Sequence, residues 1–258
     1  MRRKSILLCV VLLCSIAYAD EWKHEYKVGA KPELRVNTND AQIEVRRGGP
    51  TIQVRVETDG YKIGPGEVHI YDRQDGDVVT LDVRAPRGPF ISFRNRWIHV
   101  EVTAPENAKL DLHSDDGSLL VSGITAPADL SSGDGRIDVS AFTGPLRAKT
   151  SDGSIRVSGR FDDLSLASGD GHISCEIQAG SKMSGQWRIR TDDGSVELRI
   201  PNGFAANLEA RTGDGHIRIN MPITMKSSSS EGHHIEGALN GGGNLLDIQT
   251  GDGSININ

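Results

Sequence analysis

Seven Asp-Gly pairs are the residues of this chain best suited, by type and spacing, to bind a metal ion. The pairs are Asp116-Gly117, Asp134-Gly135, Asp152-Gly153, Asp170-Gly171, Asp193-Gly194, Asp214-Gly215 and Asp252-Gly253. The first three steps between them are 18 residues long, and the later ones are 23, 21 and 38 residues long. A column of carboxylates at this period would suit calcium, because two nine-residue calcium-binding repeats also form a coil of about 18 residues.

The residues around the pairs do not fit that calcium repeat. Its form is G-G-x-G-x-D-x-U-x, and the sixth position must be Asp to reach the ion. When Ser132 to Ile137 is aligned on it, the ligand position holds Ile137, and the other pairs carry Leu, Ile or Val there. We therefore expect a ladder of structural turns, in which Gly supplies a positive φ and Asp bonds to nearby backbone amides. No metal and no cofactor are expected.

Apolar residues alternate with polar ones on both sides of each pair. They lie six and four residues before the Asp, as Leu164 and Leu166 do for Asp170, and three and five after it, as Ile173 and Cys175 do. This period of two predicts two short strands per repeat, each with one buried face. A hydroxyl precedes each Asp by two positions, at Ser114, Ser132, Thr150, Ser168, Thr191, Thr212 and Thr250. Stacked rungs would bring these hydroxyls into a ladder.

The pattern predicts an all-β fold, a right-handed parallel β-solenoid with rungs of about 18–23 residues. We expect residues 1–19 to be a signal peptide, 20–109 an irregular β region that holds a first rung and a capping excursion, and 110–258 the regular rungs, continuous with 20–109. Residues 227–230 and 241–243 are expected to be loops around a degenerate rung at 232–235. With rungs in chain order, Asp138 would neighbour Arg156, and Glu197 would neighbour Arg218.

The amino terminus predicts export through the general secretory route. Arg2, Arg3 and Lys4 precede the apolar run 6–13, and Ala17-Tyr18-Ala19 has the form of a cleavage site. Cleavage would take the formal net charge from −6 to −9, which disfavours nucleic-acid binding. We expect a periplasmic, cell-surface or extracellular protein without a transmembrane segment in its mature chain.

The cysteines and histidines predict no chemistry. Only Cys175 would remain after cleavage, so no intrachain disulfide is expected, and its alternation with Ile173 and Ile177 predicts a buried thiol. His172 and His216 would lie in alternate rungs about 9.6 Å apart, too far to share one zinc ion. His233 and His234 are adjacent and would point to opposite faces of a strand.

Five cations form a basic stripe on the strands that precede the turns. They are Arg147, Lys149, Arg188, Arg190 and Arg211. Guanidinium groups bind carboxylate and sulfate oxygens in a bidentate way, so an acidic glycan or another envelope polymer is the partner that this stripe would suit. Acidic residues at both ends of the stripe leave an ordinary solvated face as the alternative. Nothing in the sequence predicts the oligomeric state.

One stretch of the sequence resembles a known family. Residues 105–112, Pro-Glu-Asn-Ala-Lys-Leu-Asp-Leu, followed by repeated Ser/Thr-x-Asp-Gly-x-Ile-x-Val, resemble the bacterial "putative adhesin" family of exported β-solenoids, a domain of unknown function. The resemblance covers roughly residues 30–258 and implies a role at the cell surface or in the envelope.

We interpret the chain as a non-enzymatic, adhesin-like protein. The alternative is a carbohydrate-active β-helix enzyme, a polysaccharide lyase or hydrolase, whose catalytic carboxylates should interrupt the repeat. No catalytic residue is assigned, since the Asp residues are the repeat itself and the chain has no nucleophile elbow, zinc signature or phosphate loop.

Overall fold

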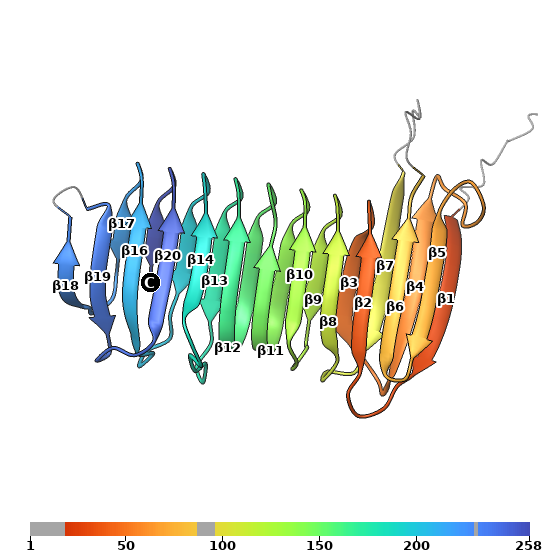
Figure 1. Ribbon diagram of the computed structural model, residues 1–258, viewed down its shortest axis with the longest axis horizontal. Helices are drawn as coiled ribbons and strands as arrows, with labels where there is room; N and C mark the ends of the chain where they lie inside the picture. Colours follow the sequence, from red (N-terminus) through yellow and green to blue (C-terminus); the bar gives the residue numbers. More distant parts are fainter. Residues whose placement is uncertain (1–18, 87–95, 230–231) are drawn as a thin grey trace, which may run out of the picture.

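The computed structural model describes residues 19–86, 96–229 and 232–258, and the predicted signal peptide lies outside them apart from Ala19. These residues form strands and turns, and they include no helix of a length and apolarity that would span a membrane. The described strands join into one continuous hydrogen-bonded sheet that winds into an elongated stack (Figure 1). The predicted all-β solenoid is therefore confirmed, while its right-handed sense stays a prediction.

The strands fall into three groups along the chain. The first group is β1 (Ala19–Lys27), β2 (Glu33–Thr38), β3 (Gln42–Arg47), β4 (Thr51–Asp59), β5 (His69–Asp75), β6 (Val78–Arg84) and β7 (Trp97–Ala104). The second is β8 (Lys109–Ser114), β9 (Leu119–Ser122), β10 (Ala128–Ser132), β11 (Ile137–Lys149), β12 (Ile155–Ser168), β13 (Ile173–Ile177), β14 (Trp187–Thr191) and β15 (Val196–Arg199). The third is β16 (Ala206–Thr212), β17 (Ile217–Ile219), β18 (Thr224–Ser228), β19 (His234–Leu239), β20 (Leu245–Thr250) and β21 (Ile255–Ile257).

Each regular rung contributes one strand to each of two faces. The pre-turn face holds the strands that precede a turn, namely β2, β8, β10, the second halves of β11 and β12, β14, β20 and β16. The post-turn face holds those that follow it, namely β3, β9, the first halves of β11 and β12, β13, β15, β21 and β17. Neighbouring rungs pair in parallel on both faces, as the crossover of a solenoid requires.

The core lies between the two faces, and the predicted inward positions fill it. In the regular rungs the alternating apolar residues are buried, with half-buried Ile217 and Ile219 as the exceptions. These two residues belong to β17, which ends the post-turn face and pairs only with β21. At the corner opposite the Asp-Gly turns, Phe142, Phe161 and Trp187 pack in sequence, with ring centroids 6.1 and 6.4 Å apart. Aromatic rings thus fill this corner of a largely aliphatic core.

The rungs do not stack in chain order. The last rung, β20 and β21, lies between the rung of β14 and β15 and the rung of β16 and β17 (Figure 1). The predicted contact of Glu197 with Arg218 is therefore wrong, because Asn256 lies between them. The register places Asp138 beside Arg156, as predicted.

The same rearrangement moves two histidines further apart than expected. The rung of β20 and β21 is inserted between the rungs of His172 and His216. The two histidines are therefore three rungs apart, which corresponds to about 14 Å. The degenerate rung predicted at 232–235 is also wrong. Residues 224–228 and 234–239 form the antiparallel pair β18 and β19, which extends the pre-turn face beyond β16.

The other end of the stack is closed in a similar way. Strands β6 and β7 pair in parallel with β2 and β3, and β5, β4 and β1 add antiparallel strands outside them. The hydroxyl of Tyr26 on β1 donates a hydrogen bond to Asp72 on β5 over 2.8 Å, which joins the two faces at this end. Antiparallel strands therefore cover both faces at this end and the pre-turn face at the other end, where unpaired edges would otherwise be exposed, whereas β17 remains the edge of the post-turn face.

Candidate functional site

The glycines of the turn ladder are required by close approach between rungs. None of the seven has a positive φ, so the predicted role of Gly in these turns is wrong. A Cβ added to Gly153 would lie 2.1 Å from the carbonyl oxygen of Gly135 in the rung before it, and the other six meet a neighbouring carbonyl at 1.9–2.1 Å. Any side chain at these positions would push two rungs apart.

The hydroxyl ladder provides the hydrogen bonds that hold each turn together and join it to the adjacent rung. Ser168 Oγ accepts a hydrogen bond from the Gly171 amide at 3.0 Å and donates one to the Gly153 carbonyl at 2.9 Å. The other six hydroxyls of the ladder make the same two bonds, with donating distances of 2.7–3.1 Å. Each buried hydroxyl thus pairs with one backbone amide in its own turn and with one backbone carbonyl in an adjacent rung.

The turn carboxylates point into solvent. The Asp residues of the seven pairs are exposed, and their backbone amides donate hydrogen bonds to the adjacent rung, but within the described residues none of their carboxylates takes part in a hydrogen bond or an ion pair. The predicted bonds from Asp to backbone amides are therefore absent there, because the hydroxyl two residues earlier makes that contact. Partial desolvation and the charge of Asp116 raise the pKa of Asp40, which occupies the Asp position of the first rung. The column of turn carboxylates thus forms an acidic edge of the solenoid, on which neighbouring carboxylates repel one another.

The predicted basic stripe is divided by the order of the rungs. Arg147 and Lys149 lie on β11, and Arg188 and Arg190 lie on β14, with the small residues Ser165 and Ala167 of β12 between them. Arg211 lies two strands beyond Arg190, because Gln249 of β20 separates them. We refer to Arg147, Lys149, Arg188 and Arg190 as the basic patch.

The cations of the basic patch differ in their partners. Arg190 donates to Asp247 over 2.9 Å, and only 6% of the Asp247 side chain is exposed. Arg188 bonds to the neutral Gln186 over 3.0 Å. In the described part of the chain, Arg147, Lys149 and Arg188 have no carboxylate within ion-pair distance. Three exposed cations therefore remain outside ion pairs on an acidic protein, with Asp129 in register beside Arg147 and Asp247 in register beside Arg188.

Arg211 belongs to a different group of charges. Its guanidinium is bonded to Glu209, two residues earlier on β16. It therefore does not extend the basic patch. The sequence places Asp247 among the acidic residues at the ends of the stripe, but it does not predict the contact with Arg190, since that contact depends on the insertion of β20.

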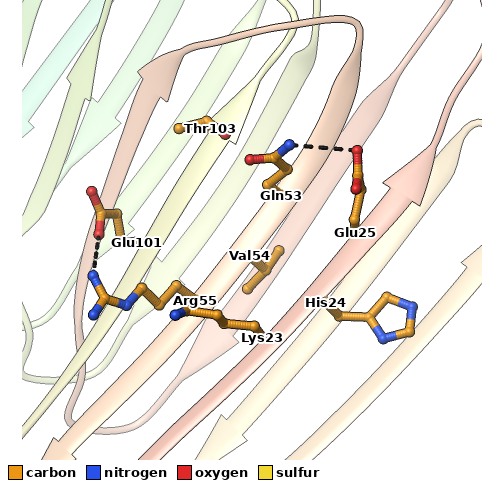
Figure 2. Close-up of a pocket in the computed structure, with 8 residues that line it drawn as sticks. All are labelled: Lys23, His24, Glu25, Gln53, Val54, Arg55, Glu101 and Thr103. Carbon is orange, nitrogen blue, oxygen red and sulfur yellow. Dashed lines mark hydrogen bonds and ion pairs between the residues drawn. The ribbon is translucent and has the colours of Figure 1, made fainter.

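A hollow of about 460 Å³ lies on the outer surface of β1, β4 and β7, and Figure 2 shows the side chains that line it. Arg55, at its centre, pairs with Glu21 and Glu57 and lies 3.8 Å from Glu101. Hydrogen bonds from Lys23 and Arg55 lower the pKa of Glu21. The charges of this hollow therefore compensate one another.

A hollow of about 530 Å³ on the post-turn face is also lined by charges that compensate one another. Asp138 lies in it, 2.6 Å from Arg136 and 3.6 Å from Arg156. The adjacent thiol of Cys175 is buried, as predicted, and burial raises its pKa far above the usual value. A thiol of this kind stays protonated and is a poor nucleophile.

Comparisons with known proteins agree with the resemblance noted in the sequence. Residues 158–258 match the family model described as Toastrack DUF4097. No curated protein matches the chain. Three solved structures are similar, each with a TM-score of 0.45: a putative cell adhesion protein from Clostridium sporogenes and putative adhesins from Bacteroides fragilis and Parabacteroides distasonis. Their sequence identities are 12%, 13% and 12% in that order. The first match covers 94% of this chain and 99% of that one, and the other two each cover 92% of this chain and 97% of the other. The match to the family model confirms the predicted resemblance to a domain family of unknown function for residues 158–258.

Proposed function

We propose that this chain is an exported, non-enzymatic solenoid that binds an acidic polysaccharide or another anionic polymer of the cell envelope through the basic patch. The observation that carries the proposal is the absence, within the described residues, of a carboxylate partner for Arg147, Lys149 and Arg188. Exposed cations with partners gain little from a further anion, whereas uncompensated ones gain a charge-assisted bond.

The spacing of the basic patch suits an extended polymer. Lys149 and Arg190 are in register two strands apart, which corresponds to about 9.6 Å. Between them, Ser165 and Ala167 leave a low strip across the rung of β12. The patch lies on a continuous sheet, so binding requires little ordering of the backbone. Asp129 and Asp247 border it, which confines the positive potential to three rungs.

A role in surface adhesion or envelope binding rests on the family resemblance and the predicted signal peptide. Both support a location outside the cytoplasm, where acidic glycans would be available as ligands. The rigid stack would present the patch at a fixed position on its side, as expected of an adhesion module.

The experiment compares the affinity of the chain for an acidic and a neutral polysaccharide at low and high salt. The test variant carries Lys149→Ser and Arg188→Ser. Arg190 is kept because its loss would leave the buried Asp247 without its cation. The control carries Arg199→Ser and Arg218→Ser on the post-turn face, which removes the same charge from exposed positions.

We expect the test variant to bind the acidic polymer on the order of tenfold more weakly, the equivalent of about 1.4 kcal/mol, and the control to bind as the wild type does. Salt should weaken the wild-type complex. Equal loss in both variants would indicate a net-charge effect, and no binding by the wild type would reject the proposal. A reducing-sugar and unsaturated-product assay on the same polymers tests the alternative of a carbohydrate-active enzyme.

A further inference from the structure

One side chain of β16 and two of β19 meet on the outer surface of this strand pair. Glu209 of β16 lies directly opposite Glu236 of β19 in the antiparallel pair, and Arg211 lies opposite His234. Within the described residues, Glu209, His234 and Glu236 are the one group of three or more possible metal ligands whose ligand atoms all lie within 4.8 Å of one another. All three side chains are partly buried.

The geometry of the group is close to that of a metal site. His234 Nε2 lies 3.3 Å from Glu236 Oε1 and 3.8 Å from Glu209 Oε1. Donor atoms bound to one zinc ion at about 2.0–2.1 Å in a tetrahedral arrangement are about 3.3 Å apart. The Nε2 atom is shielded from solvent and makes no hydrogen bond to another described residue. A buried ring nitrogen without a hydrogen bond is unusual, and its partner here is either a neighbouring carboxylate, if the ring is protonated, or a metal ion, if the ring is neutral.

The surrounding charges also favour a cation. Glu236, Glu209 and Asp247 lie in register on three successive strands, and like charges in this relation repel. Arg190 compensates Asp247, and Arg211 compensates Glu209. Among the described residues, the imidazole of His234 is the one potentially cationic group within ion-pair distance of Glu236. A divalent ion between the three side chains would remove this repulsion.

We propose that Glu209, His234 and Glu236 form a binding site for a divalent transition metal, with zinc as the best fit. One imidazole and two carboxylates make a donor set of the type that binds zinc, whereas calcium takes six to eight oxygen ligands. Arg211, bonded to Glu209, holds that carboxylate in position. Three protein ligands leave a fourth position for water or for a donor from a bound molecule.

The site is accessible from solvent. A hollow of about 300 Å³ beside it is lined by Glu209 and Glu236 together with Lys226 and Asn207. Lys226 donates to Asn207 over 3.1 Å, so it is not a competitor for the two glutamates. A metal ion could thus enter, and a small anion could reach it beside Lys226.

The test is calorimetric titration of the metal-free chain with zinc, followed by the same titration of His234→Gln and Glu236→Gln. His216→Gln is the matched control, because this exposed histidine lies near the same end of the stack but outside the group. We expect one zinc ion per chain, a Kd at least about tenfold higher in both test variants, and no change in the control. Zinc should also raise the melting temperature of the wild type and the control, but not that of the test variants.

The near-isosteric Glu236→Gln keeps the proposal testable if His234→Gln folds poorly, and circular dichroism checks both. Absence of zinc binding by the wild type would overturn the proposal. So would binding that both test variants retain, since the ion would then lie elsewhere.

Discussion

At the scale of single residues, the turns of this solenoid depend on the space between rungs rather than on backbone torsion. The seven ladder glycines adopt no left-handed conformation, and each faces a carbonyl oxygen of the adjacent rung at a distance no Cβ could tolerate. Ala41 takes the glycine position at the outer end of this ladder, where its own carbonyl faces Gly117. The need for glycine therefore arises from the neighbouring rung and not from the turn alone.

This account predicts the effect of the smallest possible side chain. Gly153→Ala should lower the free energy of unfolding by about 1–3 kcal/mol, because the new Cβ would lie 2.1 Å from the Gly135 carbonyl oxygen. Gly185→Ala is the matched control, since nothing lies within 4 Å of a Cβ there and the φ is not positive, so its effect should be neutral or slightly stabilising. Urea unfolding of the two variants measures the difference, and equal effects would contradict the account.

Asp40 gives a prediction for the pH dependence of stability. Its pKa is raised above 3.8 in the folded state, so the folded chain holds this proton more tightly than the unfolded chain does. The resulting stabilisation is fully present below 3.8 and is lost as the pH rises through the folded pKa. Asp40→Asn should therefore become more stable relative to wild type as the pH rises from about 3.5 to 6, measured by urea unfolding. A difference independent of pH would show that Asp40 titrates normally.

At the scale of elements, the sequence predicts what a rung is but not where each rung goes. The inward positions could be predicted because every strand alternates with period two around a fixed Asp-Gly turn. The order of the rungs could not, because all regular rungs carry nearly the same pattern, which does not distinguish one neighbour from another. The segment between β17 and β20 is long enough to let the last rung insert between β14 and β16.

The candidate sites follow the same division. The outward direction of Arg147, Lys149 and Arg188 could be predicted from the strand period alone. The pairing of Arg190 with Asp247 could not, since it requires the inserted rung. The group of Glu209, His234 and Glu236 could not either, because it depends on antiparallel pairing in a segment whose alternation is irregular.

Cross-linking tests the order of the rungs directly. Residues in register on adjacent parallel strands have Cα atoms about 4.8 Å apart, within the range a disulfide spans. Oxidation should therefore join the pair Glu197→Cys and Asn256→Cys. It should leave Glu197→Cys and Arg218→Cys unjoined, because about 9.6 Å separates strands two apart. A disulfide in the second pair and not in the first would restore the stacking in chain order, and non-reducing electrophoresis with mass spectrometry distinguishes the two.

At the scale of the whole molecule, the acidic and basic groups lie on different sides of the stack. The turn carboxylates form one acidic edge, whereas the basic patch lies on the pre-turn face. The formal net charge of −6 leaves the acidic edge without general compensation. Because the rungs are about 4.8 Å apart, each turn carboxylate has like-charged neighbours within the Debye length, which is about 10 Å at 0.1 M salt. The solenoid therefore keeps a repulsive edge that solvent and mobile ions must screen.

Screening should be visible in the thermal stability. Raising sodium chloride from about 10 to 200 mM should increase the melting temperature of the wild type. The double variant Asp152→Asn, Asp170→Asn should have a higher melting temperature than the wild type at low salt, and added salt should change it less, because two central repulsive charges are removed. Calcium at matched ionic strength should add nothing beyond this, since within the described residues the turn carboxylates form no group of converging ligands. A calcium-specific rise of many degrees, lost in the double variant, would instead show that the acidic edge binds ions at defined positions.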